Sequence, residues 1–178
     1  MTTLTPLARH LLDTLRPIRD YPKPGIVFQD ITPVLADGKL FRTLIEAMAD
    51  PFRDLDITHV LGIEARGFIL GGAVATSLGA GFVPARKPGK LPWERVRESY
   101  DLEYGTDALE CHRDSLHGQA RVLVVDDVLA TGGTARAAGQ LARGLGAQLV
   151  GWSFLLEIGG LGGKERLEGA LCHIIARR

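Results

Sequence analysis

The residues best suited to chemistry lie between Val122 and Thr134, where the chain reads VLVVDDVLATGGT. Four apolar residues are followed directly by two acids, Asp126 and Asp127. Such an apolar run is typical of a strand buried in a parallel sheet, and ligands bind beyond the carboxyl ends of these strands. We therefore expect both carboxylates at a ligand site. They suit the vicinal hydroxyls of a ribose, because ionised carboxylates only accept hydrogen bonds.

The turn after the acids has the composition of an anion-binding loop. Residues 131–134 (TGGT) offer hydroxyls and unhindered N–H groups where we expect a helix to begin, near Gly133. The unpaired N–H groups and the dipole of a helix N-terminus favour a phosphate, and glycine lets the backbone approach it closely. The alternative is a plain strand–turn–helix with solvated or capping aspartates. Two acids directly after four apolar residues argue against it.

This segment resembles the motif with which type I phosphoribosyltransferases bind 5-phosphoribosyl-1-pyrophosphate (PRPP). Ala130 argues for the adenine-specific branch of that family, because hypoxanthine-guanine enzymes carry an aspartate there. The resemblance covers nearly the whole chain. It implies purine salvage, in which the 5-phosphoribosyl group of PRPP is transferred to N9 of adenine, giving AMP and pyrophosphate. Four further segments resemble the adenine branch in order and spacing: Tyr21–Asp30 (YPKPGIVFQD), Glu64–Phe68 (EARGF), Val83–Pro92 (VPARKPGKLP) and Tyr100–Gly105 (YDLEYG).

The resemblance implies that one loop holds most of the PRPP. It assigns the ribose hydroxyls to Asp126 and Asp127. It implies Mg²⁺ as the cofactor, bound mainly through PRPP and pyrophosphate, with no metal site made of protein ligands alone. Mg²⁺ often binds in this way, through substrate phosphates and water. The 5′-phosphate is assigned to the phosphate loop, which comprises Ala130, Thr131, Gly132, Gly133 and Thr134.

The leaving pyrophosphate is assigned to basic residues outside this loop. The resemblance gives Arg66 a catalytic role there, after a Glu64–Ala65 peptide that is often cis in this fold. It places Lys87 and Lys90 where the family's lid approaches pyrophosphate. Taken as residues alone, Arg66 could instead form a surface ion pair, and the lysines could belong to a solvated charged face.

The adenine site is assigned to three separate segments. Glu103 matches the catalytic residue that handles a proton on the purine ring, and Tyr104 covers the base beside it. Gln29 stands where many relatives carry arginine, so its side chain departs from the family pattern. The residues themselves allow plainer alternatives, a half-exposed strand carboxylate for Glu103 and ordinary core packing for the apolar positions. The remaining adenine-binding positions are Val27, Phe28 and Ile158.

The elements that must position these residues alternate between strand and helix. A helix is predicted to begin at Thr5-Pro6 and to continue to about Ile18, and a second spans about 39–52. Strands are predicted at 59–63, 81–84, 121–125, 149–156 and 171–175, with helices over 68–78 and from about 133. Together these predict a mainly parallel, twisted α/β sheet flanked by helices, in a single domain over 1–178. The resemblance implies a small hood from about 1–35 and parts of the C-terminal region.

Residues 86–105 fit this alternation poorly, because they combine two prolines, two glycines and many charges with little apolar periodicity. A polar loop of this length in a small domain is usually functional or disordered. We expect either a flexible lid over an active site or a solvated surface excursion, with equal weight on each.

Composition limits the remaining possibilities. Lys plus Arg and Asp plus Glu both number 21, so the chain has no net charge with which to attract nucleic acid or acidic membranes. The two cysteines, Cys111 and Cys172, lack metal-type spacing and are expected to be reduced. The start of the chain does not resemble a signal peptide and no apolar stretch is long enough to span a membrane, so we expect a cytoplasmic protein. The resemblance implies a homodimer.

Three other functions remain open from the sequence. A related enzyme could use xanthine or guanine in place of adenine. A PRPP sensor that regulates transcription is a second alternative, although the short N-terminal helix and the neutral charge leave little room for a DNA-reading module. A third is a homologue that has lost its activity, against which the intact motifs argue.

Overall fold

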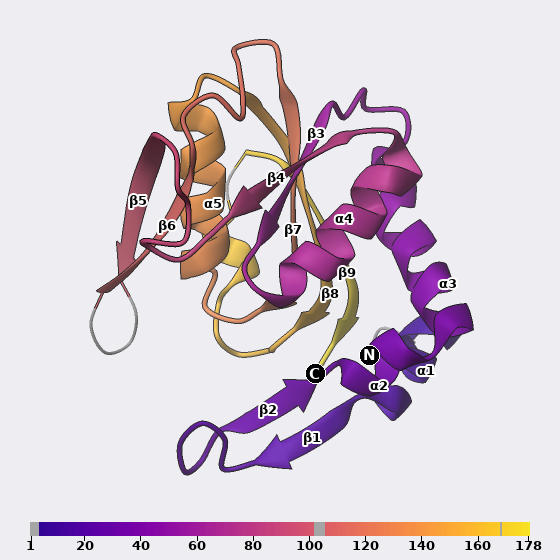
Figure 1. Cartoon of the computed structure of the whole chain (residues 1–178). Coiled ribbons are helices and arrows are strands. Elements are labelled where there is room, and N and C mark those ends of the chain that lie inside the picture. The colour runs from indigo at the N-terminus through magenta and orange to yellow at the C-terminus, as the bar shows by residue number, and fades with distance from the viewer. Residues whose placement is uncertain (1–3, 102–105, 168) are drawn as a thin grey trace.

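A five-stranded parallel sheet forms the centre of the computed structural model, which describes residues 4–101, 106–167 and 169–178. Its strands follow the order β4-β3-β7-β8-β9 (Figure 1). The predicted α/β class and the parallel sheet are therefore confirmed. The strands are β3 (His59–Ile63), β4 (Gly81–Ala85), β7 (Arg121–Leu129), β8 (Gln148–Glu157) and β9 (Leu171–Arg177).

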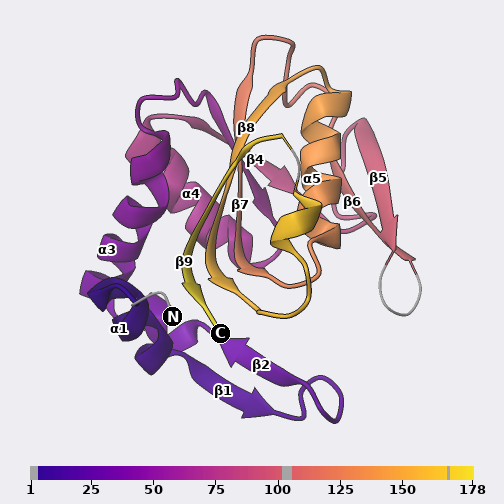
Figure 2. The same ribbon diagram turned by 180° about the vertical axis from the view of Figure 1, so that it is seen from behind.

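Helices cover both faces of this sheet and form a separate apolar core with each (Figures 1 and 2). One face packs against α1 (Pro6–Thr14), α3 (Gly38–Ala49) and α4 (Arg66–Leu78). The other face packs against α5 (Gly133–Gly144). Strands covered on both faces are mostly apolar, which is why β3 and residues 122–125 of β7 read as continuous hydrophobic runs. A short 3₁₀ turn, η1 (Asp50–Phe52), follows α3, and a second, η2 (Lys164–Arg166), follows β8.

The N-terminal part of the chain forms a hairpin beside the sheet. Strand β1 (Arg16–Arg19) pairs antiparallel with β2 (Val27–Asp30), and the short helix α2 (Thr32–Ala36) follows. The prediction that the first helix continues to about Ile18 was wrong. Helix α1 ends at Thr14, and Ile18 lies in β1 opposite Phe28. Pro17 explains this early end, because a proline disfavours helical geometry in the residue before it.

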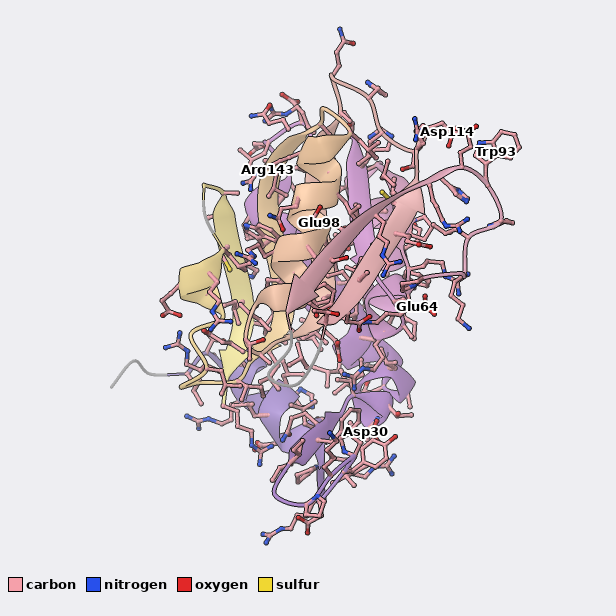
Figure 3. All side chains as sticks on the ribbon, turned by 90° about the vertical axis from the view of Figure 1, so that its left-hand side faces the viewer. Asp30, Glu64, Trp93, Glu98, Asp114 and Arg143 are labelled. Atoms are coloured by element: carbon pink, nitrogen blue, oxygen red, sulfur yellow. The ribbon has the colours of Figure 1, made fainter. Side chains whose placement is uncertain are left out.

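The polar segment 86–105 is not a loop throughout, so that prediction was wrong for residues 95–101. Arg95–Asp101 form β5, which pairs antiparallel with β6 (Thr106–His112). Val96 and Tyr100 pack into the core beneath α5, while the alternate residues Arg95, Arg97 and Ser99 are exposed. The alternation of buried and exposed residues that is typical of a strand is therefore present in β5, but its exposed residues are charged or polar. Figure 3 shows the hairpin lying across α5, with Glu98 at the crossing.

Strand β7 is longer than predicted and contains both acids. It continues through Asp126 and Asp127 to Leu129, which is paired with Glu157 of β8. The expected end at Val125 was wrong, because pairing with the long neighbour β8 carries the backbone past the charged residues. Within the part of the chain that the structure describes, no helix is long and apolar enough to cross a membrane.

Candidate active site

A cavity of about 90 Å³ lies at the carboxyl end of β7 and the N-terminus of α5. This is the edge at which ligands bind in open α/β sheets. The cavity brings Asp126 together with the whole predicted phosphate loop, whereas Asp127, which we also expected at the ligand site, is not one of its lining residues. Its lining residues are Asp126, Val128, Leu129, Ala130, Thr131, Gly132, Gly133, Thr134 and Ala135.

The backbone N–H groups of the phosphate loop are available for a ligand. Gly132 precedes α5 with a φ of 81°, a left-handed conformation that glycine adopts without strain. The first helical hydrogen bond runs from Arg136 N to Gly132 O, at 2.9 Å. Among the described residues, no acceptor is bonded to the N–H groups of residues 130–135. The loop therefore presents unpaired donors at the positive end of a helix dipole, which favours an anion.

Gly163, which the sequence analysis did not select, supports this loop from behind. A Cβ on Gly132 would lie 2.6 Å from Gly163 O, and a Cβ on Gly163 would lie 2.1 Å from Ala130 O. Neither contact is compatible with a side chain, so the two backbones pack directly on each other. The glycine-rich stretch 159–163 was the only signal in the sequence, and it does not reveal which loop the glycines touch.

The two acids occupy different surroundings. Asp126 lines the cavity and its Oδ1 accepts a hydrogen bond from Asp127 N at 2.9 Å. Asp127 is buried, with 4% of its surface exposed, and does not line the cavity. Arg66 Nε lies 2.9 Å from Asp127 Oδ2, although not at a hydrogen-bonding angle. Only Asp126 therefore faces the cavity directly, while Asp127 neutralises Arg66.

Both carboxyl groups are harder to ionise than usual. Burial and repulsion by Asp127 raise the pKa of Asp126 well above its ordinary value, although part of its surface faces the cavity. Burial also raises the pKa of Asp127, and the nearby Arg66 guanidinium limits that rise. Two adjacent carboxylates in such surroundings are typical of a functional site, because ligand groups can relieve the unfavourable charge.

Arg66 connects the acids to the N-terminal hairpin. It is the first residue of α4 and directly follows the Glu64–Ala65 peptide, which is cis. Its Nη1 donates to Gln29 O at 3.3 Å, and its Cζ lies 4.7 Å from the centre of the Phe28 ring. A guanidinium over an aromatic face is attracted to it. The structure thus brings a residue assigned to pyrophosphate against two residues assigned to adenine.

The basic segment after β4 is held by carboxylates of other elements. Glu64 accepts hydrogen bonds from Arg86 Nε at 3.1 Å and from Lys87 N at 3.0 Å (Glu64 is labelled in Figure 3). Burial acts to raise the pKa of Glu64, but these bonds outweigh it and leave the pKa below its ordinary value. Gly89 N donates to Glu110 Oε2 at 3.1 Å.

The two lysines of this segment differ in their contacts. Lys87 Nζ donates to Tyr100 OH at 2.7 Å and also contacts the Asp107 carboxylate, both on the β5–β6 hairpin. Burial lowers the pKa of Lys87, but these two bonds outweigh it and raise the pKa above its ordinary value. Lys90 is exposed, and its carbonyl accepts from Arg86 Nη1 at 3.1 Å. Asp107 was not selected from the sequence, since a lone acid beside a threonine carries no signal.

Of the other residues predicted for the adenine site, the structure describes Val27, Phe28 and Ile158. Val27 is exposed and Phe28 half-buried, and the ring of Phe28 meets that of Tyr21 edge-on with centres 5.3 Å apart. Ile158 packs against the core, and its N–H donates to Leu129 O at 2.9 Å, next to the phosphate loop. Glu103 and Tyr104 lie outside the described residues.

Metal binding by protein side chains alone has no candidate in the described residues, where no group of three or more His, Cys, Asp or Glu could hold an ion. The acids at the cavity can still supply oxygen ligands to an ion that a phosphorylated ligand brings with it. Both cysteines are free, and burial raises the pKa of each thiol to about 11.

A comparison with protein families identifies the domain. The model described as "Phosphoribosyl transferase domain" matches residues 32–164, which include the acids and the phosphate loop. The chain belongs to the phosphoribosyltransferase family. The matched segment is more than half of the chain, and the family resemblance inferred from the motifs is thereby confirmed.

Individual relatives of this phosphoribosyltransferase carry a more specific name. It is 58% identical over 165 residues to an adenine phosphoribosyltransferase of Myxococcus xanthus, covering 93% of this chain and 90% of the relative. A crystal structure of the adenine phosphoribosyltransferase of Rhodothermus marinus is 49% identical with a TM-score of 0.93, covering 97% of this chain and 98% of that one. The Giardia lamblia enzyme, complexed with 9-deazaadenine, is 35% identical with a TM-score of 0.91 and covers 99% of both chains.

Proposed function

We propose that this phosphoribosyltransferase acts in purine salvage, transferring the 5-phosphoribosyl group of PRPP to N9 of adenine with release of pyrophosphate. One observation carries the proposal: the unpaired N–H groups of the phosphate loop and the Asp126 carboxylate converge on one cavity at the carboxyl edge of the sheet. A sugar phosphate offers complementary groups, an anion for the amides and hydroxyls for the carboxylate.

Adenine as the acceptor is supported by two further observations. Relatives that share half or more of their residues with this chain are named adenine phosphoribosyltransferases, and the Giardia lamblia relative was solved with an adenine analogue. In this chain, Arg66 contacts both Phe28 and Gln29. A base bound at β2 would therefore lie next to the arginine assigned to pyrophosphate, as a reaction between the two substrates requires.

The roles in the PRPP site are those that the family resemblance implies. The phosphate loop, residues 130–134, binds the 5′-phosphate, and Asp126 binds the ribose hydroxyls from the cavity. The family resemblance assigns the same hydroxyls to Asp127, which does not line the cavity in this structure and must be exposed by a local rearrangement to reach them. The guanidinium of Arg66, which lies against Asp127 in this structure, contacts the pyrophosphate when PRPP is bound. Lys87 and Lys90 approach the same group from the segment after β4, which requires Lys87 to exchange its contacts with Tyr100 and Asp107.

The roles in the adenine site rest on β2 and on the segment between β5 and β6. Phe28 stacks on the purine ring, and backbone groups of Val27 and Gln29 read its polar edge. Ile158 contacts the base from the C-terminal side, and Tyr104 covers it. Glu103 handles the proton exchanged on the ring as N9 forms its bond to C1.

The chemistry is a displacement at C1 of the ribose. The bond from C1 to pyrophosphate breaks with its electron pair on the leaving oxygen, and N9 of adenine forms the new bond. A transition state of this kind resembles an oxocarbenium ion, so positioning and stabilisation of the leaving charge dominate catalysis. Arg66 and the lysines supply that stabilisation, and closure of the segment 86–105 excludes water that would hydrolyse PRPP.

Mg²⁺ is proposed as the cofactor, bound mainly through PRPP and pyrophosphate. The residues present fit such an ion, since Asp126 lines the cavity and its carboxylate can supply an oxygen ligand to an ion that arrives with PRPP. When bound, it neutralises the phosphate oxygens and orients the leaving group.

The oligomeric state and the cellular location of the enzyme are part of the same proposal. A homodimer is supported by the resemblance and by two exposed apolar side chains, Ile69 on α4 and Phe82 on β4. Light scattering measures this state directly. A cytoplasmic location is part of the proposal. The zero net charge supports the absence of nucleic-acid and membrane partners, because it gives no general attraction to either.

The test is to incubate the purified protein with PRPP, Mg²⁺ and a panel of adenine, hypoxanthine, guanine and xanthine. AMP and pyrophosphate should form in equal amounts from adenine, with far slower turnover of the other bases. Faster turnover of another base would move the enzyme to a different branch. Tight PRPP binding without pyrophosphate release from any base would indicate a sensor instead of an enzyme.

A further inference from the structure

Gln29 is hydrogen-bonded both to α4 and to the end of β9, and so attaches the N-terminal hairpin to the parallel sheet and its helices. A two-stranded hairpin is marginal by itself and depends on such attachments. Asp30 of β2 is bonded locally to Thr32 of α2, but among the described residues the two hydrogen bonds that join β1 and β2 to α4 and to the end of β9 both involve Gln29. Arg66 Nη1 donates to its carbonyl at 3.3 Å, and Arg178 Nη1 donates to its side-chain Oε1 at 2.9 Å.

The contacts of the Gln29 side chain fix its orientation. Its Oε1 accepts from Arg178, and its Nε2 donates to Val27 O at 3.2 Å. Arginine can only donate and a carbonyl can only accept, so the opposite orientation of the amide would break both bonds. The Gln29 amide therefore links Arg178 to the backbone of Val27, and Gln29 as a residue is only 7% exposed.

Arg178 is itself held by the parallel sheet. It follows β9 directly, its N–H donates to Glu157 O at 2.9 Å, and its carbonyl accepts from Gly159 N at 2.8 Å. These bonds extend the pairing between β8 and β9. Figures 1 and 2 both show this end of the chain beside β2. The guanidinium thus reaches the hairpin from a backbone position that the sheet determines.

We propose that Arg178 is a positioning residue for the purine base, acting through Gln29. It holds the amide of Gln29 so that Val27 O and the backbone of β2 stay in one orientation toward the base. The inference rests on the proposed function, in which the β2 backbone reads the polar edge of adenine. It adds a residue that lies 149 positions from Gln29 in the sequence and acts through the Gln29 amide.

The test is steady-state kinetics of Arg178→Ala, with both substrates varied. Loss of one charge-assisted hydrogen bond at a partly exposed position should raise the KM for adenine about fivefold to tenfold. The KM for PRPP should stay within about twofold of the original value, because the phosphate loop and the acids are untouched. A residue with a merely structural role would change both KM values together. The matched control is Arg42→Ala, which removes an exposed arginine of α3.

A double-mutant cycle with Gln29→Ala tests the route. If Arg178 acts through Gln29, the double variant should have the same KM for adenine as Gln29→Ala alone. Additive effects, or a KM for adenine within about twofold of the original in Arg178→Ala, would overturn the inference. These results are distinct from a failure of the proposed function, which would appear as no AMP from the unmodified protein. Thermal melts confirm that each variant is folded.

Discussion

Among single residues, Asp127 combines deep burial with a charged partner, which makes its carboxylate hard to replace. We predict that Asp127→Asn weakens PRPP binding about tenfold to a hundredfold, since bonds to a charged group contribute about 1.5–3 kcal/mol. Isothermal titration calorimetry with PRPP and Mg²⁺ measures this. Asp114→Asn, a change at an exposed aspartate, is the control and should bind normally. An unchanged affinity in Asp127→Asn would contradict the ribose assignment.

Asp126 illustrates a conflict between stability and binding. Its pKa is raised from the ordinary 3.8 in the folded protein, so its ionised form destabilises the fold at neutral pH. Asp126→Asn should therefore raise the melting temperature at pH 7.5 by a few degrees, at about 2–4 °C per kcal/mol for a chain of this size. Binding of PRPP should fall in the same variant.

The stabilisation by Asp126→Asn should depend on pH in a defined direction. The cost of ionising Asp126 is absent at low pH, where the carboxyl is protonated in both states, and appears as the pH rises through the raised pKa. The advantage of Asp126→Asn should thus shrink as melts are repeated toward pH 4. A melting difference that stays constant with pH would show that ionisation of Asp126 is not its origin.

At the scale of elements, the phosphate loop depends on a second loop that contacts no substrate. Gly163→Ala places a Cβ against Ala130 O and must displace one of the two backbones. We predict a loss of about 1–3 kcal/mol in stability, typical of overpacking, together with weaker PRPP binding. Thermal melts and calorimetry measure the two effects.

A glycine of the adjacent helix provides the control for this change. Gly144 is the last residue of α5, and a Cβ there would meet nothing within 4 Å. Gly144→Ala should keep or slightly increase stability, because alanine favours helix by up to about 1 kcal/mol. If Gly163→Ala were tolerated equally well, the contact between the two loops would have no role in shaping the site.

For the molecule as a whole, ligand binding should be visible as stability. PRPP with Mg²⁺ at about a hundred times its Kd should stabilise the fold by about 2.7 kcal/mol, which corresponds to about 5–11 °C. Removing Mg²⁺ with EDTA should abolish most of this rise in melting temperature, since the ion neutralises the pyrophosphate. Ribose 5-phosphate, which lacks pyrophosphate, should give a smaller shift that does not depend on Mg²⁺. Equal shifts for PRPP with and without EDTA would remove Mg²⁺ from the site.

The sequence by itself determined the parallel sheet, its flanking helices and the phosphate loop. These features are local, because a buried strand is a continuous apolar run and a phosphate loop consists of neighbouring residues joined by the chain. Strand β3 and the start of α5 were predicted at their observed residues. Strand β5 was missed because its buried residues, Val96 and Tyr100, alternate with charged ones in a segment interrupted by prolines.

Only the tertiary structure decided which distant residues meet. The contacts of Gln29 with Arg66 and Arg178 span 37 and 149 positions in the sequence, and no local pattern encodes either of them. The support of the phosphate loop by Gly163 is of the same kind. Such contacts follow from the order in which strands join the sheet and from the packing of loops at its edge. Which residues meet depends on the packing of the complete fold. The site could therefore be predicted from the sequence, but the residues that support it could not.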